Sequence, residues 1–393
     1  MVNLKGTANR QELIDLLSDL VRIESINPDY PGGKQGEGNV VKYVADYFDK
    51  HGIEYYTQEV LPGRSNLIAK LPGKRPGGVC MEAHTDTVTI EGMTIEPFDP
   101  VIKDGLLYGR GSCDTKGSLA CMMYSMVLLK RLGIVPETDV YLAAAVDEEF
   151  RFRGVTHLLE QGFRCKYAIT GEPTDLHVVT ACKGVARFAL STHGKAGHSS
   201  RPDEGHNAIQ DMGEILHAIQ TEMIPMLKNR PLHPLLGRGS VNVGVINGGV
   251  LINIIPDTCR VEIDRRVLPG ETYESVMAEF EEIIAPLREK DPQFGCSFEP
   301  LLIDYAMDTP QDTELVQTAV AASEDILGTH TIEGVSYGCD GTKLYRAGAQ
   351  TIVFGPGSIL QAHTACEYID IEHLAPAAEM YAQICATLSG DDA

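Results

Sequence analysis

The sequence predicts an α/β protein in which a smaller α+β domain is inserted into a discontinuous first domain. Residues 1–182 alternate between apolar, strand-like runs and helices with one apolar face, and residues 301–393 return to this alternation. Such alternation predicts a mixed, mostly parallel sheet flanked by helices. Residues 183–300 follow the order strand–helix–strand–strand–helix–strand. That order is typical of a ferredoxin-like domain.

The length and charge of the chain fit two acidic domains. With 393 residues, of which 43% are hydrophobic, the chain has room for about two domains with large cores. The 55 Asp and Glu residues outnumber the 33 Lys and Arg residues, which gives a formal net charge of −22. Nucleic acids and anionic membranes both require a basic surface, so neither is expected as a partner. We interpret the acidity as an aid to solubility.

The cysteines and the N-terminus favour a cytoplasmic protein. The ten cysteines are scattered and form no C-x-x-C pair, so we expect reduced, mostly buried thiols. The first ten residues are polar and lack the apolar core of a secretion signal. No run approaches the roughly 18 apolar residues that a membrane-spanning helix needs.

Apolar spacing places the elements of the first domain. Leu13, Leu16, Leu17 and Leu20 recur at the spacing of an amphipathic helix, which Asn27-Pro28 ends. A second helix is expected to stop at Gly52, a helix-capping residue. The helices expected in residues 1–182 cover 10–23, 36–51, 118–132 and 154–160, and the strands cover 66–71, 78–81, 138–146 and 167–170.

The pattern changes near Cys182 and changes back after about residue 300. The inserted domain is expected to contain strands at 185–192, 240–246, 257–266 and 296–302 and helices at 207–227 and 271–287. Gly248-Gly249 predicts a turn, and the Pro/Gly-rich residues 228–240 predict a surface loop. The last part is expected to contain helices at 314–327 and 371–387 and a strand at 351–354.

The run from Val79 to Val88 carries the first candidate functional residues. This apolar run ends on His84, and Asp86 follows two residues later. Residues i and i+2 of a strand point to the same side, so both can meet at the carboxyl end of the strand, where open α/β sheets place their sites. A His-x-Asp pair alone fits a metal site and a surface pair about equally well.

Further acidic residues and a second histidine follow in the sequence. They are Asp114 within Gly109–Gly117, the run Asp147-Glu148-Glu149, Glu172 and His363. Imidazole with carboxylate suits zinc, and this set would hold a pair of divalent ions. Taken singly, each has an ordinary alternative: an acidic turn for 147–149, a helix cap for Asp114, and loop residues for Glu172 and His363.

In this order the motifs resemble those of the M20 metallopeptidases, a family that includes acetylornithine deacetylase, succinyl-diaminopimelate desuccinylase, aminoacylase-1 and carboxypeptidase G2. The resemblance runs from the first expected helix to the last. It implies that residues 1–182 and 301–393 form a zinc-hydrolase catalytic domain. It also implies that the inserted domain, 183–300, is a lid that often forms the interface of a homodimer.

The resemblance implies a role for each polar residue of the first domain. His84 would bind one ion and His363 the other, with Asp114 between them; Glu172 would complete the first site and Glu149 the second. Asp86 would accept the remaining N–H of His84. Glu148 would be the general base that takes a proton from metal-activated water. Zinc is the expected metal, with cobalt and manganese as alternatives.

The same resemblance implies a set of residues around the substrate. His198, in Gly194–Ser200, would help to hold the oxyanion from a partner subunit, although a surface-loop histidine is the alternative. Asn253 and Arg266 would contact the substrate carboxylate; the alternative for Arg266 is a salt bridge at the end of a strand. Gly355 and Ser358 belong to a Gly-Pro-Gly-Ser motif close to the acetylornithine deacetylase form.

One cysteine departs from the family pattern, and another lies next to an implied ligand. Cys366 stands where the family usually has Asp, and Cys113 precedes Asp114. Neither replaces an implied ligand. A soft-ligand or oxidation-sensitive role for either thiol stays open.

We therefore expect a metal-dependent amidohydrolase that removes an N-acyl group from a small amino-acid-like substrate, as acetylornithine deacetylase does. A desuccinylase, a dipeptidase or a carboxypeptidase of the same family is the alternative. A non-catalytic binding protein is the rival from another class, and it is disfavoured because Glu148 and all five implied ligands are present. Which acyl group and which amino acid are used stays open.

Overall fold

The computed structural model describes residues 2–389, which form two compact units. The first unit combines residues 2–180, 309–333 and 339–389, and the second combines 181–308 and 334–338. The first unit is therefore discontinuous in the sequence. The expected inserted domain, 183–300, lies within the second unit. Residues 1 and 390–393 of the expected catalytic segments lie outside the described residues.

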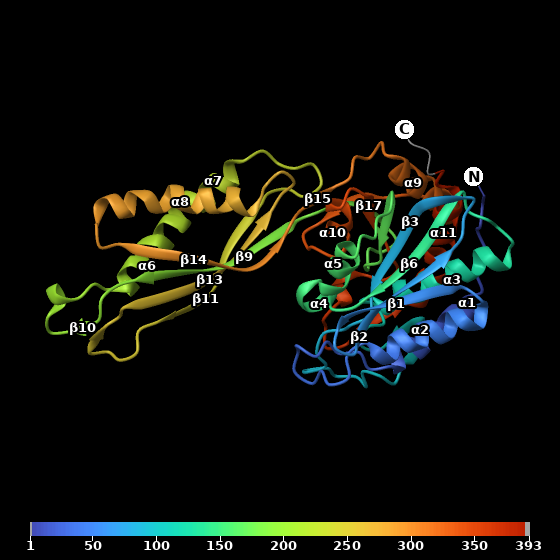
Figure 1. Ribbon diagram of the computed structural model, residues 1–393, viewed down its shortest axis with the longest axis horizontal. Coiled ribbons are helices and arrows are strands. Elements are labelled where there is room, and N and C mark those ends of the chain that lie inside the picture. Colours follow the sequence, from blue (N-terminus) through green and yellow to red (C-terminus); the bar gives the residue numbers. More distant parts are fainter. Residues whose placement is uncertain (1, 390–393) are drawn as a thin grey trace. The chain divides into compact units, whose positions relative to one another are not determined.

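Helices surround a mixed sheet in the first unit (Figure 1). Its helices are α1 (Arg10–Arg22), α2 (Gly38–His51), α3 (Lys116–Arg131), α4 (Glu148–Arg151), α5 (Arg153–Glu160), α9 (Glu314–Leu327), α10 (Gly341–Arg346) and α11 (Leu374–Thr387). Its strands are β1 (Glu54–Leu61), β2 (Arg64–Leu71), β3 (Arg75–His84), β6 (Thr138–Ala145), β7 (Tyr167–Thr170), β17 (Gln350–Val353) and parts of β8 (Val178–Cys182) and β16 (Ile332–Val335).

The strands of this sheet follow the order β1-β2-β6-β3-β7-β17-β8. The four central strands, β6, β3, β7 and β17, run parallel, whereas β1–β2, β2–β6 and β17–β8 pair antiparallel. The predicted mixed sheet flanked by helices is confirmed, but its parallel part is confined to the centre. β1 and β2 are joined by only two residues, Pro62 and Gly63, and such a short connection requires antiparallel pairing.

The core of the first unit centres on α3. This helix packs against α1 and α11, and its side chains are buried from Lys116 to Leu129. A helix that is apolar on most sides is expected to lie inside the protein. It begins at Lys116, two residues after Asp114, so its first turn fixes the loop that carries this carboxylate.

A smaller sheet, which the sequence did not predict, lies in the same unit. It has the order β18-β5-β4 and consists of β4 (Val101–Lys103), β5 (Leu106–Tyr108) and β18 (Tyr368–Asp370). β18 pairs antiparallel with β5, which brings the C-terminal part of the chain beside residues 106–108.

The second unit has the predicted ferredoxin-like arrangement. Its main sheet has the antiparallel order β11-β13-β9-β14, and side chains of β13 are buried alternately, as expected for a sheet covered on one face. The elements of this unit are β9 (Gly184–His193), β10 (Gly197–His198), α6 (Ala208–Ala218), α7 (Ile224–Asn229), β11 (Ser240–Gly248), β12 (Ile254–Ile255), β13 (Thr258–Val267), α8 (Tyr273–Lys290), β14 (Gly295–Asp304) and β15 (Met307–Asp308).

The single helix expected at 207–227 is interrupted. α6 ends at Ala218, a π-helical turn covers Ile219–Met223, and α7 begins at Ile224. Pro225 explains the change because proline has no N–H to donate to a carbonyl one turn earlier and its ring crowds that carbonyl.

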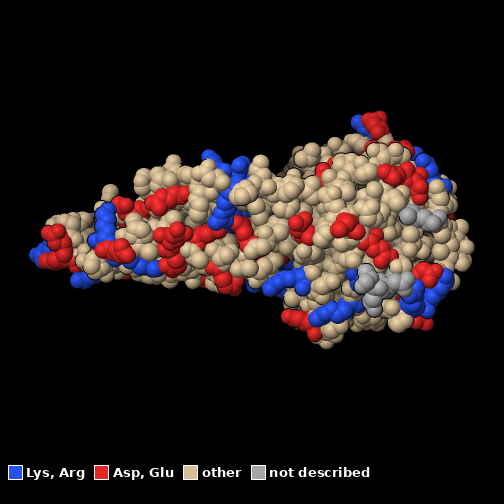
Figure 2. Space-filling view, turned by 90° about the horizontal axis from the view of Figure 1, so that it is seen from above, with Lys and Arg blue, Asp and Glu red and all other residues tan. Residues whose placement is uncertain are grey.

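The surface agrees with the acidic composition. Figure 2 shows Asp and Glu side chains interspersed with Lys and Arg on the face it presents, without a continuous basic patch there. Among the described residues, no helix has both the length and the apolar character for crossing a membrane.

Candidate metal centre and active site

All five predicted metal ligands lie in the first unit, at the end of a strand, in loops or in the short helix α4. His84 ends β3, Asp114 precedes α3, Glu149 lies in α4, Glu172 follows β7 and His363 precedes β18. β3 pairs in parallel with β6 on one side and β7 on the other. Because parallel strands end at the same edge of a sheet, the segments after β3, β6 and β7 meet there.

The carboxylate of Asp114 lies between the two histidines. Its Oδ1 is 3.1 Å from Nε2 of His84, and its Oδ2 is 3.3 Å from Nε2 of His363. Each imidazole also has a glutamate near it: Glu172 Oε1 is 4.0 Å from His84, and Glu149 Oε2 is 3.0 Å from His363. The structure thus offers two sets of one imidazole and one glutamate, joined by a shared aspartate. These residues fit a pair of bridged divalent ions.

The orientation of His84 is suited to metal binding. Its Nδ1 lies 3.0 Å from the backbone carbonyl of Asp86, which can only accept, so Nδ1 carries the proton. Nε2, on the side of Asp114, is therefore the nitrogen that would bind a metal ion. The resemblance implied that the carboxylate of Asp86 has this role, but that carboxylate is farther away, at 3.5 Å.

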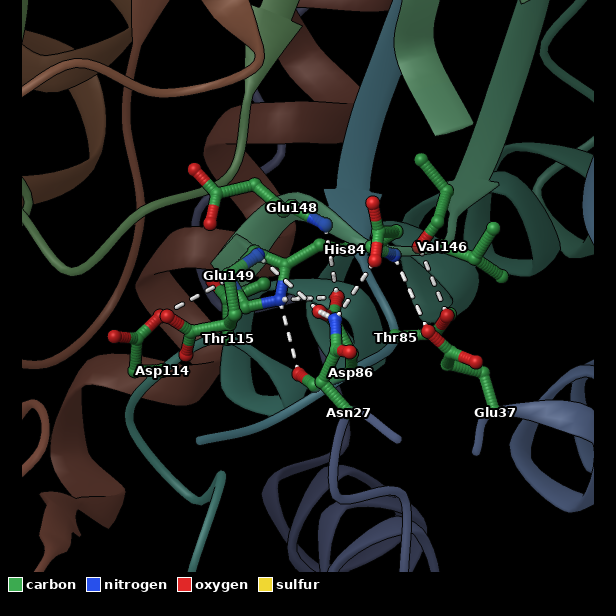
Figure 3. Close-up of polar contacts among 12 residues, drawn as sticks. Asn27, Glu37, His84, Thr85, Asp86, Asp114, Thr115, Val146, Glu148 and Glu149 are labelled. Carbon is green, nitrogen blue, oxygen red and sulfur yellow. Dashed lines mark hydrogen bonds and ion pairs between the residues drawn. The ribbon is translucent and has the colours of Figure 1, made fainter. Parts of the chain in front are cut away.

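The carboxylate of Asp86 is occupied by other donors. It accepts the backbone N–H groups of Glu148 at 3.1 Å and of Glu149 at 3.2 Å, and the side-chain amide of Asn27 at 2.7 Å (Figure 3). Asp86 therefore connects the end of β3 to the acidic turn that follows β6. This explains why its backbone, and not its carboxylate, lies closest to His84.

Burial and negative charge dominate the electrostatics of the site. Burial raises the pKa of Glu148 and of Glu172 well above the usual value, and raises the pKa of Glu149 to about 7. The carboxylates of Asp114 and Glu149 raise the pKa of His363 to about 10. Burial opposes ionisation of Asp114, but the two imidazoles outweigh it and lower its pKa. Such a concentration of buried acids requires compensating positive charge.

Comparison with known proteins identifies the family. A sequence profile described as peptidase family M20/M25/M40 matches residues 80–387. The chain belongs to this family. Acetylornithine deacetylase of Myxococcus xanthus is 32% identical over 350 residues, covering 88% of this chain and 87% of the relative. Acetylornithine deacetylase of Photorhabdus laumondii is 32% identical over 386 residues, covering 94% and 96%.

Solved structures of M20 proteins share the fold. Aminopeptidase PepT from Bacillus cereus superimposes with a TM-score of 0.80 at 23% identity, covering 97% of this chain and 99% of that one. A Bacillus subtilis protein described as a dinuclear metal binding peptidase from the M20 family superimposes with a TM-score of 0.71 at 19% identity, covering 96% and 97%. The prediction of a metal-dependent amidohydrolase of the M20 family is confirmed.

The M20 site rests on a buried polar network that the sequence did not reveal. Asp147 accepts hydrogen bonds from Arg64 and from Asn27, both at 3.0 Å, and also binds Arg153. Glu37 accepts two hydrogen bonds from Arg64, at 2.6 and 2.7 Å, and one from the backbone of Asp147. Figure 3 shows Asn27 and Glu37 beside the turn. From the sequence, Asn27-Pro28 was interpreted as a helix stop and Asp147 as part of an acidic run, without a link between them.

A buried lysine also lies next to the predicted ligands. Lys116 is fully buried, and its ammonium group donates to the carbonyl of Ile23 at 2.7 Å. Burial lowers the pKa of Lys116 to about 7. Its position two residues after Asp114 is the signal in the sequence that could have marked it as a candidate.

The predicted substrate residues His198, Asn253 and Arg266 lie in the second unit. The side chains of His198 and Asn253 are exposed. Arg266 donates to Asp264 at 2.9 Å, the salt bridge that was its alternative reading. The neighbouring Arg265 is completely buried and points to the other face, as alternation predicts.

Gly355 and Ser358 lie in the first unit, beside the segment of Glu172. A side chain at Gly355 would lie 2.3 Å from Ser118 Oγ and 2.5 Å from the carbonyl of Glu172, so glycine permits close packing here. Ser358 is half-buried, and its carbonyl accepts the thiol hydrogen of Cys113 at 3.3 Å. Burial raises the pKa of Cys113, whereas Cys366 is partly exposed.

A second group of potential ligands lies in the second unit. His206 is 2.7 Å from Asp211 through Nε2 and 4.0 Å from Asp291 through Nδ1. The two carboxylates thus flank opposite nitrogens of the ring. One ligand atom from each of the three residues nevertheless lies within 4.8 Å of the other two, which is close enough to hold a metal ion. Through these contacts His206 links the loop before α6 to the loop after α8.

Proposed function

We propose that this chain uses two bound metal ions to remove an acyl group from the nitrogen of a small amino-acid-like substrate. The main support is the position of Asp114: its two carboxylate oxygens face two imidazoles, and each imidazole has a glutamate near it. The relatives named acetylornithine deacetylase support an N-acyl amino acid as substrate, and the Bacillus subtilis neighbour supports a dinuclear centre. Zinc is the first choice of metal, with cobalt or manganese as alternatives.

Glu148 is the proposed proton carrier. The bound ions would supply a Lewis acid for the scissile carbonyl and for the attacking water. The Glu148 carboxylate, 9% exposed and next to the ligand Glu149, accepts a proton from that water and delivers it to the leaving amine. Asp86 holds the backbone N–H of Glu148, so this carboxylate is presented from a fixed turn.

The second unit would supply contacts to the substrate as a lid. Nδ1 of His198 accepts the backbone N–H of Ser200 at 3.2 Å, so the neutral ring carries its proton on Nε2. The Nε2–H group can donate a hydrogen bond to an oxyanion, and this is the role we propose for His198. We propose that Arg266 and Asn253 bind the substrate carboxylate and that Gly355 and Ser358 line the substrate site through their backbone.

A homodimer through the second unit is part of the proposal. β11 is an edge strand of its sheet, and the turn after it exposes apolar side chains, among them Val250 at 87% and Ile252 at 102%. Edge strands and exposed apolar groups favour pairing with another chain. Ile246→Asp, on β11, is expected to convert a dimer into monomers in sedimentation analysis. The control is Leu132→Asp, a comparably exposed leucine of the first unit. A wild-type monomer would refute this part.

The free thiols support a cytoplasmic location. All ten cysteines lie among the described residues and none is in a disulfide. Reducing compartments preserve such thiols.

Metal content together with a substrate panel tests the main proposal. The panel contains N-acetyl-ornithine, N-succinyl-diaminopimelate, N-acetyl-methionine and a dipeptide, with Glu148→Gln as variant and Glu160→Gln, an exposed glutamate of α5, as control. We expect two ions per chain, preference for an acylated amino acid, and a loss in kcat of about 10²–10⁴ for Glu148→Gln with both ions retained.

The alternatives give different results in the same assay. Turnover of the dipeptide or the succinylated compound alone would assign a peptidase or a desuccinylase. Two ions without any turnover would remove the acetylornithine assignment, and neither metal nor turnover would favour a binding protein. An unaffected Glu148→Gln enzyme would refute the assignment of the base.

A further inference from the structure

Glu367 is a buried carboxylate surrounded by hydrogen-bond donors. Its side chain is completely inaccessible to solvent. Oε1 accepts the backbone N–H groups of Cys113 and Asp114, both at 3.0 Å. Oε2 accepts the N–H of Gly111 at 2.9 Å and Nη1 of Arg110 at 2.8 Å. Four donors, two on each oxygen, therefore fix one segment of backbone around one charge.

Arg110, which forms an ion pair with Glu367, extends this arrangement toward His363. Arg110 is 2% exposed, and its Nη2 donates to the carbonyl of Thr89 at 3.0 Å and to that of Thr364 at 3.4 Å. Thr364 follows His363 directly. The ion pair between Arg110 and Glu367 thus connects the loop of Asp114 to the loop of His363, although these loops are about 250 residues apart in the sequence.

The small sheet brings the two loops to the same place. Tyr108, the last residue of β5, pairs with Tyr368, the first residue of β18. The chain leaves β5 toward Asp114 and enters β18 from His363. The backbone N–H of Gly109 also donates to the carbonyl of Glu367 at 3.1 Å. Glu367 therefore lies where both loops meet the paired strands β5 and β18.

His363 depends on such an anchor because regular structure does not hold it. It lies in a loop with φ of 59°, and 54% of its side chain is exposed. The nearby backbone is attached through Thr364 to Arg110 and through Ala365 to Thr94, whose N–H donates at 2.8 Å.

We propose that Glu367 is a positioning residue of the metal centre. Its carboxylate holds the loops of Asp114 and His363 together, so that the shared carboxylate and the exposed imidazole stay within reach of the same ion. This inference rests on the proposed two-metal function. Glu367 does not contact the metals or the substrate; it acts through the backbone of Asp114 and through Arg110.

Glu367→Gln is the decisive variant. In this variant the side-chain NH₂ of glutamine replaces one of the two carboxylate oxygens. The two N–H donors that this oxygen accepted then lose their acceptor, while the shape of the side chain is preserved. Glu367→Asp keeps the charge but shortens the side chain. The matched control is Glu279→Gln, which alters another buried glutamate, paired with Arg265 and Arg230 in the second unit.

The measurements are Zn²⁺ affinity by titration calorimetry, the visible spectrum of the Co²⁺-loaded protein, and kcat and KM at increasing free Zn²⁺. We expect Glu367→Gln to lose about 10- to 100-fold in affinity for at least one ion, as is typical when a group supporting a ligand is removed. The Co²⁺ spectrum should change, kcat should recover as Zn²⁺ is raised, and KM should change little. Glu367→Asp should lose less.

The outcomes separate this inference from the proposed function. A wild-type chain that binds fewer than two ions would refute the proposed function, and this inference with it. If the wild-type chain binds two ions, a folded Glu367→Gln protein with unchanged affinity and spectrum would overturn the inference alone, even if it unfolds at lower temperature, as Glu279→Gln is expected to do. If Glu367→Gln does not fold, Glu367→Asp decides: weaker binding supports the role and unchanged binding overturns it.

Discussion

At the scale of single residues, buried carboxylates that are not among the proposed metal ligands organise the site. Asp86 has a backbone carbonyl that orients His84 and a carboxylate that binds the N–H groups of Glu148 and Glu149. One residue thereby connects the proposed ligand on β3 to the proposed ligand and the proposed base after β6. A carboxylate whose oxygens are filled by several donors is more rigid than one that is free to rotate.

Asp86→Asn is expected to weaken the metal centre. The side-chain NH₂ of asparagine would face N–H donors that the carboxylate of Asp86 now accepts. The turn that carries Glu148 would then lose an acceptor for its backbone. We expect a loss of about 10- to 100-fold in metal affinity and a fall in kcat that excess Zn²⁺ restores only in part. Equilibrium dialysis and steady-state kinetics measure both. Wild-type affinity in the variant would show that the carbonyl of Asp86 alone orients His84.

A carboxylate away from the site provides a pH-dependent prediction. Asp139 is 4% exposed and accepts Lys70 at 2.8 Å, the N–H of Gly73 at 3.0 Å and the hydroxyl of Tyr141 at 3.2 Å. Burial alone would raise its pKa, but the hydrogen bonds from Lys70 and Gly73 outweigh burial and lower the pKa below the usual value of an aspartate. A lowered pKa in the folded state stabilises the protein above the unfolded-state pKa, and this contribution is lost as the pH falls.

Asp139→Asn should therefore lower the free energy of unfolding by about 1 kcal/mol at neutral pH. The difference from wild type should shrink below about pH 4 and vanish when the folded carboxyl is protonated. Urea unfolding at several pH values measures this, and Asp312→Asn, at an exposed position, is the control. A pH-independent difference would mean that shape, and not charge, accounts for the effect.

The sequence was informative about residues whose neighbours along the chain reveal them. His84 ends an apolar run, and Glu149 and Glu172 follow two other runs, so all three could be placed at one edge of a sheet. Asn27, Glu37 and Arg64 could not be found in this way. Their roles depend on which distant side chains face each other after folding, and no local pattern records that pairing.

At the scale of elements, length and periodicity decided what could be predicted. The helix at 314–327 was predicted with the bounds that α9 has, because its apolar positions repeat over four turns. The strands β4, β5 and β18 have three residues each, too few for a period to show. β1 was missed because none of its side chains is buried: four are exposed and four are intermediate. The short strands β5 and β18 nevertheless bring Glu367 to the loop of Asp114.

Two helical glycines should respond to alanine in opposite directions. Gly213 lies in α6 with nothing within 4 Å of an added Cβ, so Gly213→Ala should stabilise the protein by about 0.5–1 kcal/mol through lower backbone entropy in the unfolded state. Gly154 lies in α5, where a Cβ would come within 2.3 Å of the carbonyl of Val146.

Gly154→Ala should therefore destabilise the protein by more than about 2 kcal/mol, the cost of overpacking against backbone. Because Val146 precedes the turn of Glu148, kcat should also fall in this variant, but not in Gly213→Ala. Thermal unfolding and steady-state kinetics test the pair. Equal effects of the two substitutions would contradict the packing around α5.

At the scale of the whole molecule, all five proposed metal ligands belong to one unit. They come from two stretches of sequence, 84–172 and the loop at 363, on either side of the second unit. Metal binding would therefore join segments that are remote in sequence within the first unit. The second unit has its own core, built from its sheet and from α6 and α8, and does not require the metals for its packing.

Zinc should accordingly protect the two units unequally. A ligand that binds only the folded state stabilises it by RT ln(1 + [L]/Kd), about 2.7 kcal/mol at 100 times Kd. In hydrogen-exchange mass spectrometry, peptides covering 109–117, 147–154 and 363–368 should therefore exchange up to about 100-fold more slowly with Zn²⁺ than with a chelator. Peptides of α6 and α8 should not change.

The same experiment with Glu367→Gln, at a zinc concentration that saturates the wild type, should show less protection at 109–117 and 363–368 than at 147–154. The reason is that Glu367 connects the first two segments directly and does not contact the third. Equal protection of both units by zinc would show instead that the second unit is stabilised together with the metal centre. The ions would then act on the whole molecule, and the second unit could not be treated as a separately folded insertion.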